Sequence, residues 1–146
     1  MTNVIKPFRI LIAYDDTDDV QLTKDCFNEN RLPIDVNDVG DGQILMDHLK
    51  GMMNVSNLRD LPQLILLDLN MPRKNGLEAL KELKQDDALR KIPVVIFSTS
   101  QASKDVEKAY ELGASCFISK PNTLEEWCDK MSKLGRFWIE CVRVSS

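Results

Sequence analysis

The sequence predicts an α/β fold in which a doubly wound, five-stranded parallel sheet carries helices on both faces. Three short apolar runs, each followed by polar residues, predict buried strands at Phe8–Tyr14, Leu64–Leu67 and Val94–Phe97. Near-continuous apolar runs of this length are typical of strands that are covered on both faces. Two weaker runs, Ile34–Val39 and Cys116–Ser119, predict the remaining strands. Helical patterns in the intervals indicate βαβ units with right-handed crossovers.

Five helical patterns alternate with these strands. The first begins at an N-cap residue, Asp16 or Thr17. The fifth is expected to be extended, from about residue 124 to about residue 142, and residues 54–61 are expected to form a loop. The apolar positions that mark the helices are, in chain order, Val20, Cys26 and Phe27; Ile44, Leu45, Leu49 and Met52; Leu77, Leu80 and Leu83; Val106, Ala109, Tyr110 and Leu112; and Trp127, Cys128, Met131 and Leu134.

Length and composition favour one folded domain. A chain of 146 residues suits one compact unit, so residues 1–146 are predicted to form a single domain. Its 43% hydrophobic and 29% charged residues exclude a disordered chain. No apolar run approaches the roughly 20 residues of a membrane span, and the N-terminus lacks the apolar core of a secretory signal. We therefore expect a cytoplasmic protein without a membrane segment.

Charge and metal-binding residue types exclude further classes. The formal net charge of -4 argues against nucleic acid as a partner. Because His48 is the only histidine, His-rich metal sites and most catalytic triads are excluded. The four cysteines, Cys26, Cys116, Cys128 and Cys141, form no CxxC pair and lie within apolar patterns. They are predicted to be reduced core residues.

Polar side chains follow most of the predicted strands. They are Asp15, Asp16, Asp18 and Asp19 after the first strand, Asp68 after the third, Ser98 after the fourth and Lys120 after the fifth. In open α/β sheets, ligands bind beyond the carboxyl ends of the strands. Carboxylate oxygens suit Mg²⁺, and a hydroxyl and an ammonium beside the metal can neutralise a phosphoryl group. Since an aspartate can itself accept that group, the pattern predicts phosphoryl chemistry on a carboxylate.

Four motifs occur in order along nearly the whole chain. They are the acidic turn that begins at Asp15, the segment Asp68–Gly76, the segment Pro93–Ser98 and the segment Gly113–Pro121. With these motifs on the predicted strands, the chain resembles the receiver domains of two-component response regulators. The resemblance implies a flavodoxin-like sheet with strand order 2-1-3-4-5.

The resemblance also implies an acceptor and a metal site. It makes Asp68 the phosphoacceptor and makes Asp15, Asp68 and the backbone carbonyl of Asn70 ligands of Mg²⁺. Asp16 is a further candidate, for an outer-sphere oxygen. One residue departs from the family pattern, because Tyr14 occupies the first of two positions at which receivers usually carry acids. We therefore expect Mg²⁺ to bind more weakly than in the usual receiver.

Three further roles follow from the resemblance. Ser98 is expected to be the hydroxyl that turns toward the phosphoryl group, and Phe117 the aromatic switch residue coupled to it. Lys120 is expected to pair with the phosphate. The Lys120–Pro121 bond is expected to be cis, as is typical of the family.

The C-terminal segment carries an apolar stripe with two interpretations. Its residues follow helical spacing and are Leu134, Phe137, Trp138, Cys141 and Val142. The stripe either covers the protein's own core, with Gly135 as an alternative end of the helix, or forms a partner interface. Phe137-Trp138 is also similar to stand-alone receivers of the phytochrome-associated type, which often dimerise, so the C-terminal face is a candidate homodimer surface.

The sequence therefore predicts a response regulator of a two-component phosphorelay. A sensor histidine kinase or phosphotransfer protein would phosphorylate Asp68, and the signal would pass to a downstream protein by direct contact. The chain is predicted to be a phosphoacceptor rather than an enzyme, with self-phosphorylation and autodephosphorylation at most. Tyr14 supports one alternative, a pseudo-receiver that binds partners without phosphorylation. The segment Asp16–Val20 fits the DxDx(T/V) motif of a second, a haloacid-dehalogenase-like phosphatase.

Overall fold

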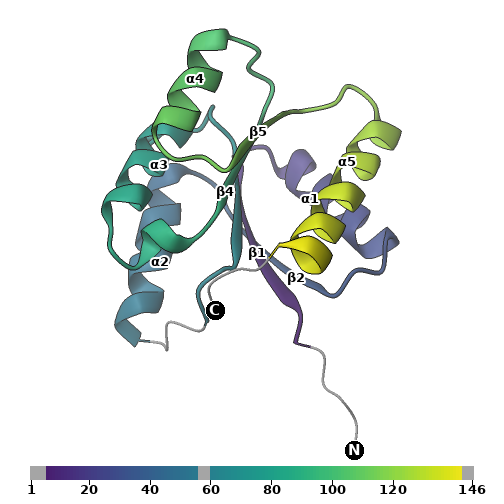
Figure 1. Ribbon diagram of the computed structural model, residues 1–146, viewed down its shortest axis with the longest axis horizontal. Helices are drawn as coiled ribbons and strands as arrows, with labels where there is room; N and C mark the ends of the chain where they lie inside the picture. Colours follow the sequence, from purple (N-terminus) through teal and green to yellow (C-terminus); the bar gives the residue numbers. More distant parts are fainter. Residues whose placement is uncertain (1–5, 56–59, 143–146) are drawn as a thin grey trace, which may run out of the picture.

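The computed structural model describes residues 6–55 and 60–142 and shows a three-layer α/β domain (Figure 1). All strand pairs of the central sheet are parallel, and the strand order is β2-β1-β3-β4-β5. The strands are β1 (Phe8–Ala13), β2 (Ile34–Val39), β3 (Leu64–Leu67), β4 (Val94–Ser98) and β5 (Cys116–Ser119). The predicted fold class and strand order are thus confirmed.

Helices cover both faces of the sheet. They are α1 (Thr17–Glu29), α2 (Gly42–Val55), α3 (Gly76–Gln85), α4 (Ser103–Glu111) and α5 (Leu124–Arg136), with a 3₁₀-helix η2 (Leu89–Lys91) and a π-helix η3 (Phe137–Cys141). Helices α1 and α5 lie side by side on one face, and α2, α3 and α4 lie on the other (Figure 1). Among the described residues, no helix is long and apolar enough to cross a membrane.

Apolar side chains on β1 and β3 build both halves of the core. On β1, Ile10 and Ile12 pack with α1 and α5, whereas Leu11 and Ala13 pack with α2 and α3. This alternation follows from the two-residue period of a strand. Because β1 and β3 are central and the chain winds in opposite directions from them, their carboxyl ends border the switch point where ligands bind in such sheets.

The prediction of four reduced core cysteines is wrong for three residues, because Cys26 and Cys128 are oxidised and Cys141 is exposed. Cys26 of α1 and Cys128 of α5 form a disulfide bond, with Cα atoms 4.9 Å apart. Cys116 is a partly buried free thiol, and Cys141 is an exposed one. The disulfide arises because α1 and α5 bring the two residues face to face across a sequence separation of 102 residues. Spacing along the sequence carries no information on such a pairing.

The C-terminal helical segment continues past Gly135. A side chain at this position would approach Leu32 Cδ1 to 2.7 Å, so the glycine lets α5 lie close to the chain before β2. The helical segment then continues through η3, where Trp138 is buried with the α1 and α5 core. Phe137, however, is 54% exposed. The apolar stripe therefore divides between the protein's own core and its surface.

Candidate functional site

Asp68 lies at the centre of the carboxyl edge of the sheet. It follows β3 directly, and its N–H donates to the carbonyl oxygen of Ala13 at the end of β1, at 3.0 Å. Only 4% of its surface is exposed. A carboxylate buried to this degree needs a charged or polar partner, because desolvation disfavours the ionised form.

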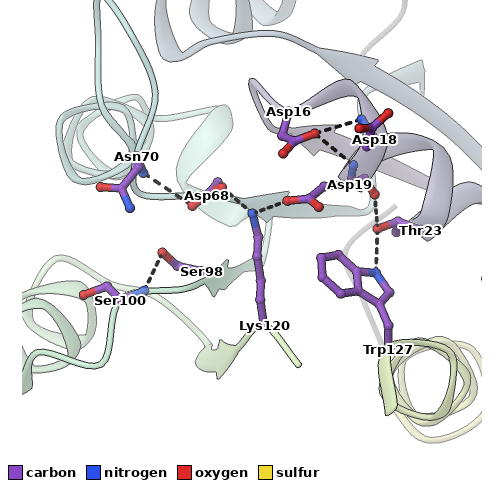
Figure 2. A network of polar contacts seen from close by, with 10 residues as sticks. All are labelled: Asp16, Asp18, Asp19, Thr23, Asp68, Asn70, Ser98, Ser100, Lys120 and Trp127. Atoms are coloured by element: carbon purple, nitrogen blue, oxygen red, sulfur yellow. Dashed lines mark hydrogen bonds and ion pairs between the residues drawn. The ribbon is translucent and has the colours of Figure 1, made fainter. Parts of the chain in front are cut away.

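Lys120 supplies that partner. Its Nζ lies 2.5 Å from Asp68 Oδ2 and 2.9 Å from Asp19 Oδ2, and its side chain is 5% exposed (Figure 2). Burial alone would lower the pKa of Lys120, but the two carboxylates outweigh it and raise the pKa above 10.5. The ammonium is therefore charged at neutral pH and joins the ends of β3 and β5 to the first turn of α1.

Asp15 and Asn70 face a cavity beside this ion pair. The cavity has a volume of about 530 Å³. It is lined by Asp15, Leu69, Asn70, Met71, Pro72, Asn75, Leu77 and Asp105. The predicted ligands, the carboxylates of Asp15 and Asp68 and the backbone carbonyl of Asn70, are hard oxygen donors. Such donors fit Mg²⁺, which keeps most of its water ligands. Within residues 6–55 and 60–142, no three His, Cys, Asp or Glu side chains form a metal-binding group.

Asp16 has a structural task. It is the N-cap of α1, as predicted, and its Oδ1 accepts the N–H groups of Asp18 at 2.9 Å and Asp19 at 3.3 Å. This oxygen satisfies donors that the helix leaves without a partner. Asp16 therefore stabilises the turn that carries Asp15 and Asp19.

Tyr14 fills the position at which the sequence departs from the receiver pattern. It is 1% exposed, and its ring centroid lies 4.9 Å from Lys120 Nζ. Its hydroxyl has no hydrogen-bond partner in the described part of the chain. Burial, and then the charges of Asp68 and Asp19, raise the pKa of Tyr14 well above 10.0. A neutral ring thus replaces a negative charge beside Asp68.

Ser98 also lies at this edge. It is fully buried at the end of β4, and its Oγ accepts the N–H of Ser100 at 3.3 Å (Figure 2). Ser100 Oγ in turn donates to Asp105 Oδ2 at 2.5 Å. Phe117 lies on the neighbouring strand β5, partly buried against the α2–α4 core, and its N–H donates to Tyr110 Oη at 3.0 Å. The two predicted switch residues therefore lie on adjacent strands.

The expected cis bond between Lys120 and Pro121 is wrong. The described residues contain no cis peptide bond. A trans bond before proline is the ordinary state, favoured by about 0.5–1 kcal/mol. The β5–α5 connection places Lys120 against Asp68 and Asp19 in this conformation.

The loop after Asp68 turns tightly into α3. The N–H of Gly76 donates to the carbonyl oxygen of Leu69 at 3.0 Å, and a Cβ at this position would collide with the carbonyl oxygen of Asp68. Asn75 caps α3 in a reciprocal capping box with Glu78. Glycine is thus required where the loop folds back on Asp68.

Sequence reasoning missed a clamp that holds the same loop. Arg73 Nε and Nη2 lie 2.9 and 3.2 Å from the two carboxylate oxygens of Asp41, and Arg73 adopts a left-handed backbone with φ of 62°. Asp41 also caps α2 by accepting the N–H of Ile44, and the N–H of Gly42 donates to Lys74 O. The hydrogen bonds from Arg73 come first among the causes that lower the pKa of Asp41. No motif links the partners, which are 32 residues apart.

A family comparison decides the assignment. The family model for the response regulator receiver domain matches residues 10–132, from β1 into α5. The chain belongs to this family. The match includes Asp15, Asp68, Ser98 and Lys120, so the predicted resemblance is confirmed along most of the described chain.

Several relatives of this receiver domain align over most of their length. The response regulator Rcp1 of Synechocystis sp. is 34% identical over 93% of this chain and 92% of its own. The probable methanogenesis regulatory protein FilR2 of Methanothrix harundinacea is 29% identical over 91% and 84%. The phosphorylated cyanobacterial phytochrome response regulator RcpA has a TM-score of 0.87 at 33% identity, covering 96% and 99%. A Mn²⁺-bound structure of Rcp1 has a TM-score of 0.86 at 33% identity, covering 96% and 100%.

These findings give the phosphatase alternative no support. That alternative requires Asp16 as the nucleophile, whereas in this receiver domain an oxygen of Asp16 caps α1. It also leaves Asp68 and its ion pair with Lys120 without a task. The structural and family matches are instead to response regulator receivers.

The Asp41–Arg73 clamp generates a prediction on stability and pH. Since the folded-state pKa of Asp41 lies below 3.8, its contribution is present above that pH and is lost as the pH falls through the folded-state pKa. Asp41→Asn is expected to lower the free energy of unfolding by about 2 kcal/mol at pH 7, the value of charged hydrogen bonds. The difference should shrink in acid. Urea unfolding at pH 7 and pH 3 measures both.

Asp47→Asn is the matched control, because Asp47 is an exposed carboxylate of α2 whose side chain accepts a hydrogen bond from Gln43 of the same helix. It is expected to change the unfolding free energy by less than about 0.5 kcal/mol. A loss in Asp41→Asn no larger than in this control would contradict the clamp.

Proposed function

We propose that this receiver domain accepts a phosphoryl group on Asp68 from a phosphohistidine of a sensor histidine kinase or phosphotransfer protein, with Mg²⁺ as cofactor. The supporting observation is the buried Asp68 carboxylate, 2.5 Å from the Lys120 ammonium, at the edge of the sheet that Asp15 and Asn70 share. A carboxylate held beside a fixed cation can act as nucleophile while the cation stabilises the developing charge.

The proposed phosphoryl transfer is a displacement at phosphorus. A carboxylate oxygen of Asp68 forms the new P–O bond as the P–N bond to the donor imidazole breaks, and the imidazole retains the bonding electron pair. The Lys120 ammonium, which pairs with Asp68, would neutralise charge on the phosphoryl oxygens, and the hydroxyl of Ser98 would donate a hydrogen bond to one of them. The acyl phosphate adds negative charge to a site that already holds Asp15 and Asp19, so its cationic partners must reorganise around it.

The metal part of the proposal rests on donor chemistry. Asp15, Asp68 and the carbonyl of Asn70 would hold Mg²⁺, which supplies charge neutralisation for the phosphoryl oxygens when bound. The Mn²⁺-bound Rcp1 structure supports a divalent cation in a similar fold. Asp16 is proposed at most to contact a metal-bound water through Oδ2, because Oδ1 is used by the helix.

Output is proposed to be contact with a downstream protein. Ser98 at the end of β4 would turn toward the phosphoryl group, and Phe117 on β5 would change its packing in response. Phe117 contacts α4 through Tyr110, and Ser98 is linked to α4 through Ser100 and Asp105. The face formed by α4 and β5 would then differ between the two states.

We also propose a second copy of this chain as the partner of the C-terminal face. Phe137 is exposed next to a cavity of about 680 Å³ with mainly apolar walls. The cavity is lined by Ser115, Cys116, Ile118, Lys130, Lys133, Leu134, Phe137 and Trp138. In a two-fold symmetric pair, Phe137 of each copy would cover the cavity of the other.

Phosphorylation of Asp68 is tested by intact mass after incubation with acetyl phosphate and Mg²⁺. The parent protein is expected to gain one phosphoryl group, and Asp68→Asn is expected to gain none, because the amide cannot form the acyl phosphate. Asp16→Asn is the matched control: asparagine caps a helix as well as aspartate does, so this variant should still be modified. An unmodified parent protein would favour the pseudo-receiver instead.

Tyr14 generates a prediction on metal affinity. Tyr14→Glu adds a carboxylate beside Asp68 and Asp19, so Mg²⁺ is expected to bind about tenfold more tightly, equivalent to about 1.4 kcal/mol. Without Mg²⁺ the same variant should lose about 1–3 kcal/mol of unfolding free energy, the cost of a buried group without a partner. Fluorescence titration and urea unfolding measure the two effects. If Tyr14→Phe binds Mg²⁺ as tightly as Tyr14→Glu, the interpretation fails.

The homodimer is tested by light scattering coupled to size-exclusion chromatography. The parent protein is expected at about twice its 16.6 kDa mass, and Phe137→Ser at the monomer mass, because the variant loses the exposed aromatic contact. Tyr110→Ser, which removes an exposed aromatic side chain of α4, is the control and should leave the dimer intact. A monomeric parent protein at high concentration rejects this interface.

A further inference from the structure

Three links join α1 to the segment that runs from β5 into α5. Lys120 pairs with Asp19, Trp127 contacts Thr23, and Cys128 is bonded to Cys26. On α1 the three partners are spaced four and three residues apart, so they lie on one face of the helix. The links therefore form a continuous row from the candidate acceptor site to the disulfide.

The first two links form one hydrogen-bonded chain. Trp127 Nε1 donates to Thr23 Oγ1 at 3.1 Å, and Thr23 Oγ1 donates to the carbonyl oxygen of Asp19 at 2.8 Å (Figure 2). The carboxylate of Asp19 accepts from Lys120, which also pairs with Asp68. Trp127 directly precedes Cys128, so the disulfide restrains the residue at which this chain enters α5.

The two cysteines of the disulfide differ in burial. Cys26 is fully buried, whereas Cys128 is partly exposed. An external thiolate would therefore approach the disulfide from the side of Cys128. Cys128 Sγ also lies 3.8 Å from Glu29 Oε2 of α1. In the reduced protein this carboxylate would be an available acceptor for the Cys128 thiol.

We propose that Cys26 and Cys128 are a reversible thiol–disulfide site that sets the reactivity of Asp68, an inference that rests on the proposed phosphoacceptor function. A small dithiol is the reductant: one thiolate attacks Cys128 Sγ and forms a mixed disulfide, and Cys26 leaves as a thiolate and takes up a proton. The second thiolate of the dithiol closes its own disulfide and releases Cys128, which is then protonated. Two electrons pass to the protein, and an external disulfide reverses the reaction.

The disulfide is proposed to affect Asp68 by holding Lys120 in position before the reaction. In the oxidised form a covalent bond holds α5 against α1, and through Trp127 and Thr23 it restrains the turn that bears Asp19. Lys120 is eight positions before Cys128 and bridges Asp19 to Asp68. Reduction removes the covalent restraint, so Lys120 spends less time in the geometry that stabilises a transferring phosphoryl group. The oxidised form is therefore the faster acceptor.

The experiment uses the full chain with Cys116→Ser and Cys141→Ser, which leaves only the two disulfide-forming cysteines of the four. The protein is equilibrated in mixtures of reduced and oxidised dithiothreitol and then alkylated, and its intact mass is measured by mass spectrometry. We expect a reversible transition between a form with no alkylated cysteine and a form with two. In acetyl phosphate and Mg²⁺, the reduced form is expected to gain the phosphoryl group about fivefold more slowly, at the lower end of coupling between sites.

Cys128→Ser in the same background is the matched variant, because it removes the bond at the partly exposed position. It is expected to react at the slow rate with and without dithiothreitol. A bond that fails to form in oxidised dithiothreitol, or a reduced form that reacts as fast as the oxidised one, overturns the proposal.

A second measurement separates this inference from the proposed function. If neither redox form gains a phosphoryl group, the proposed acceptor function has failed. Amide hydrogen exchange around Lys120 and Asp19 then tests whether the disulfide still affects the site. Faster exchange at these residues in the reduced form supports a link between the cysteines and the site. Equal exchange in the two forms overturns it.

Discussion

The ion pair between Lys120 and Asp68 is the interaction on which the rest of the site depends. Two carboxylates, Asp68 and Asp19, approach one ammonium at the buried edge of the sheet. Without that ammonium, the buried Asp68 carboxylate would lack a compensating charge, which folded proteins rarely tolerate. Because the three residues come from β3, α1 and the end of β5, this single contact requires the correct order of the sheet and the correct position of the first helix.

Tyr14 fits the same balance of charge. In the receiver pattern its position holds an acid, which would bring a third negative charge toward Lys120. The ring instead packs beneath the ammonium and against Phe97, which contacts Trp127 edge-on. The candidate metal site has fewer carboxylates as a result, and the aromatic core extends from Trp127 of α5 to Tyr14, whose ring lies beneath the ammonium that pairs with Asp68. Belonging to the family therefore does not fix the affinity of this site for a cation.

Features that depend on a local sequence pattern could be predicted from the sequence alone. The run Leu64–Leu67 is short and apolar at every position, which is typical of a strand covered on both faces, and it places Asp68 at a strand end. The cap at Asp16 follows from side-chain chemistry alone. By contrast, the Cys26–Cys128 bond and the Asp41–Arg73 clamp depend on how helices and loops meet in space. Asp19 was visible as one of several acids, but only the structure pairs it with Lys120.

The disulfide also changes the conformations that are open to the unfolded chain. Because the bond joins residues 102 positions apart, the oxidised polypeptide is a large closed loop with two free tails, even after every helix and strand has melted. The loop contains Asp68, Ser98 and Lys120, whereas β1 with Tyr14 and Asp15 lies on the N-terminal tail. An unfolded loop is more compact and exposes less new surface than a linear chain. The oxidised protein should thus show a shallower dependence of stability on denaturant than its reduced counterpart.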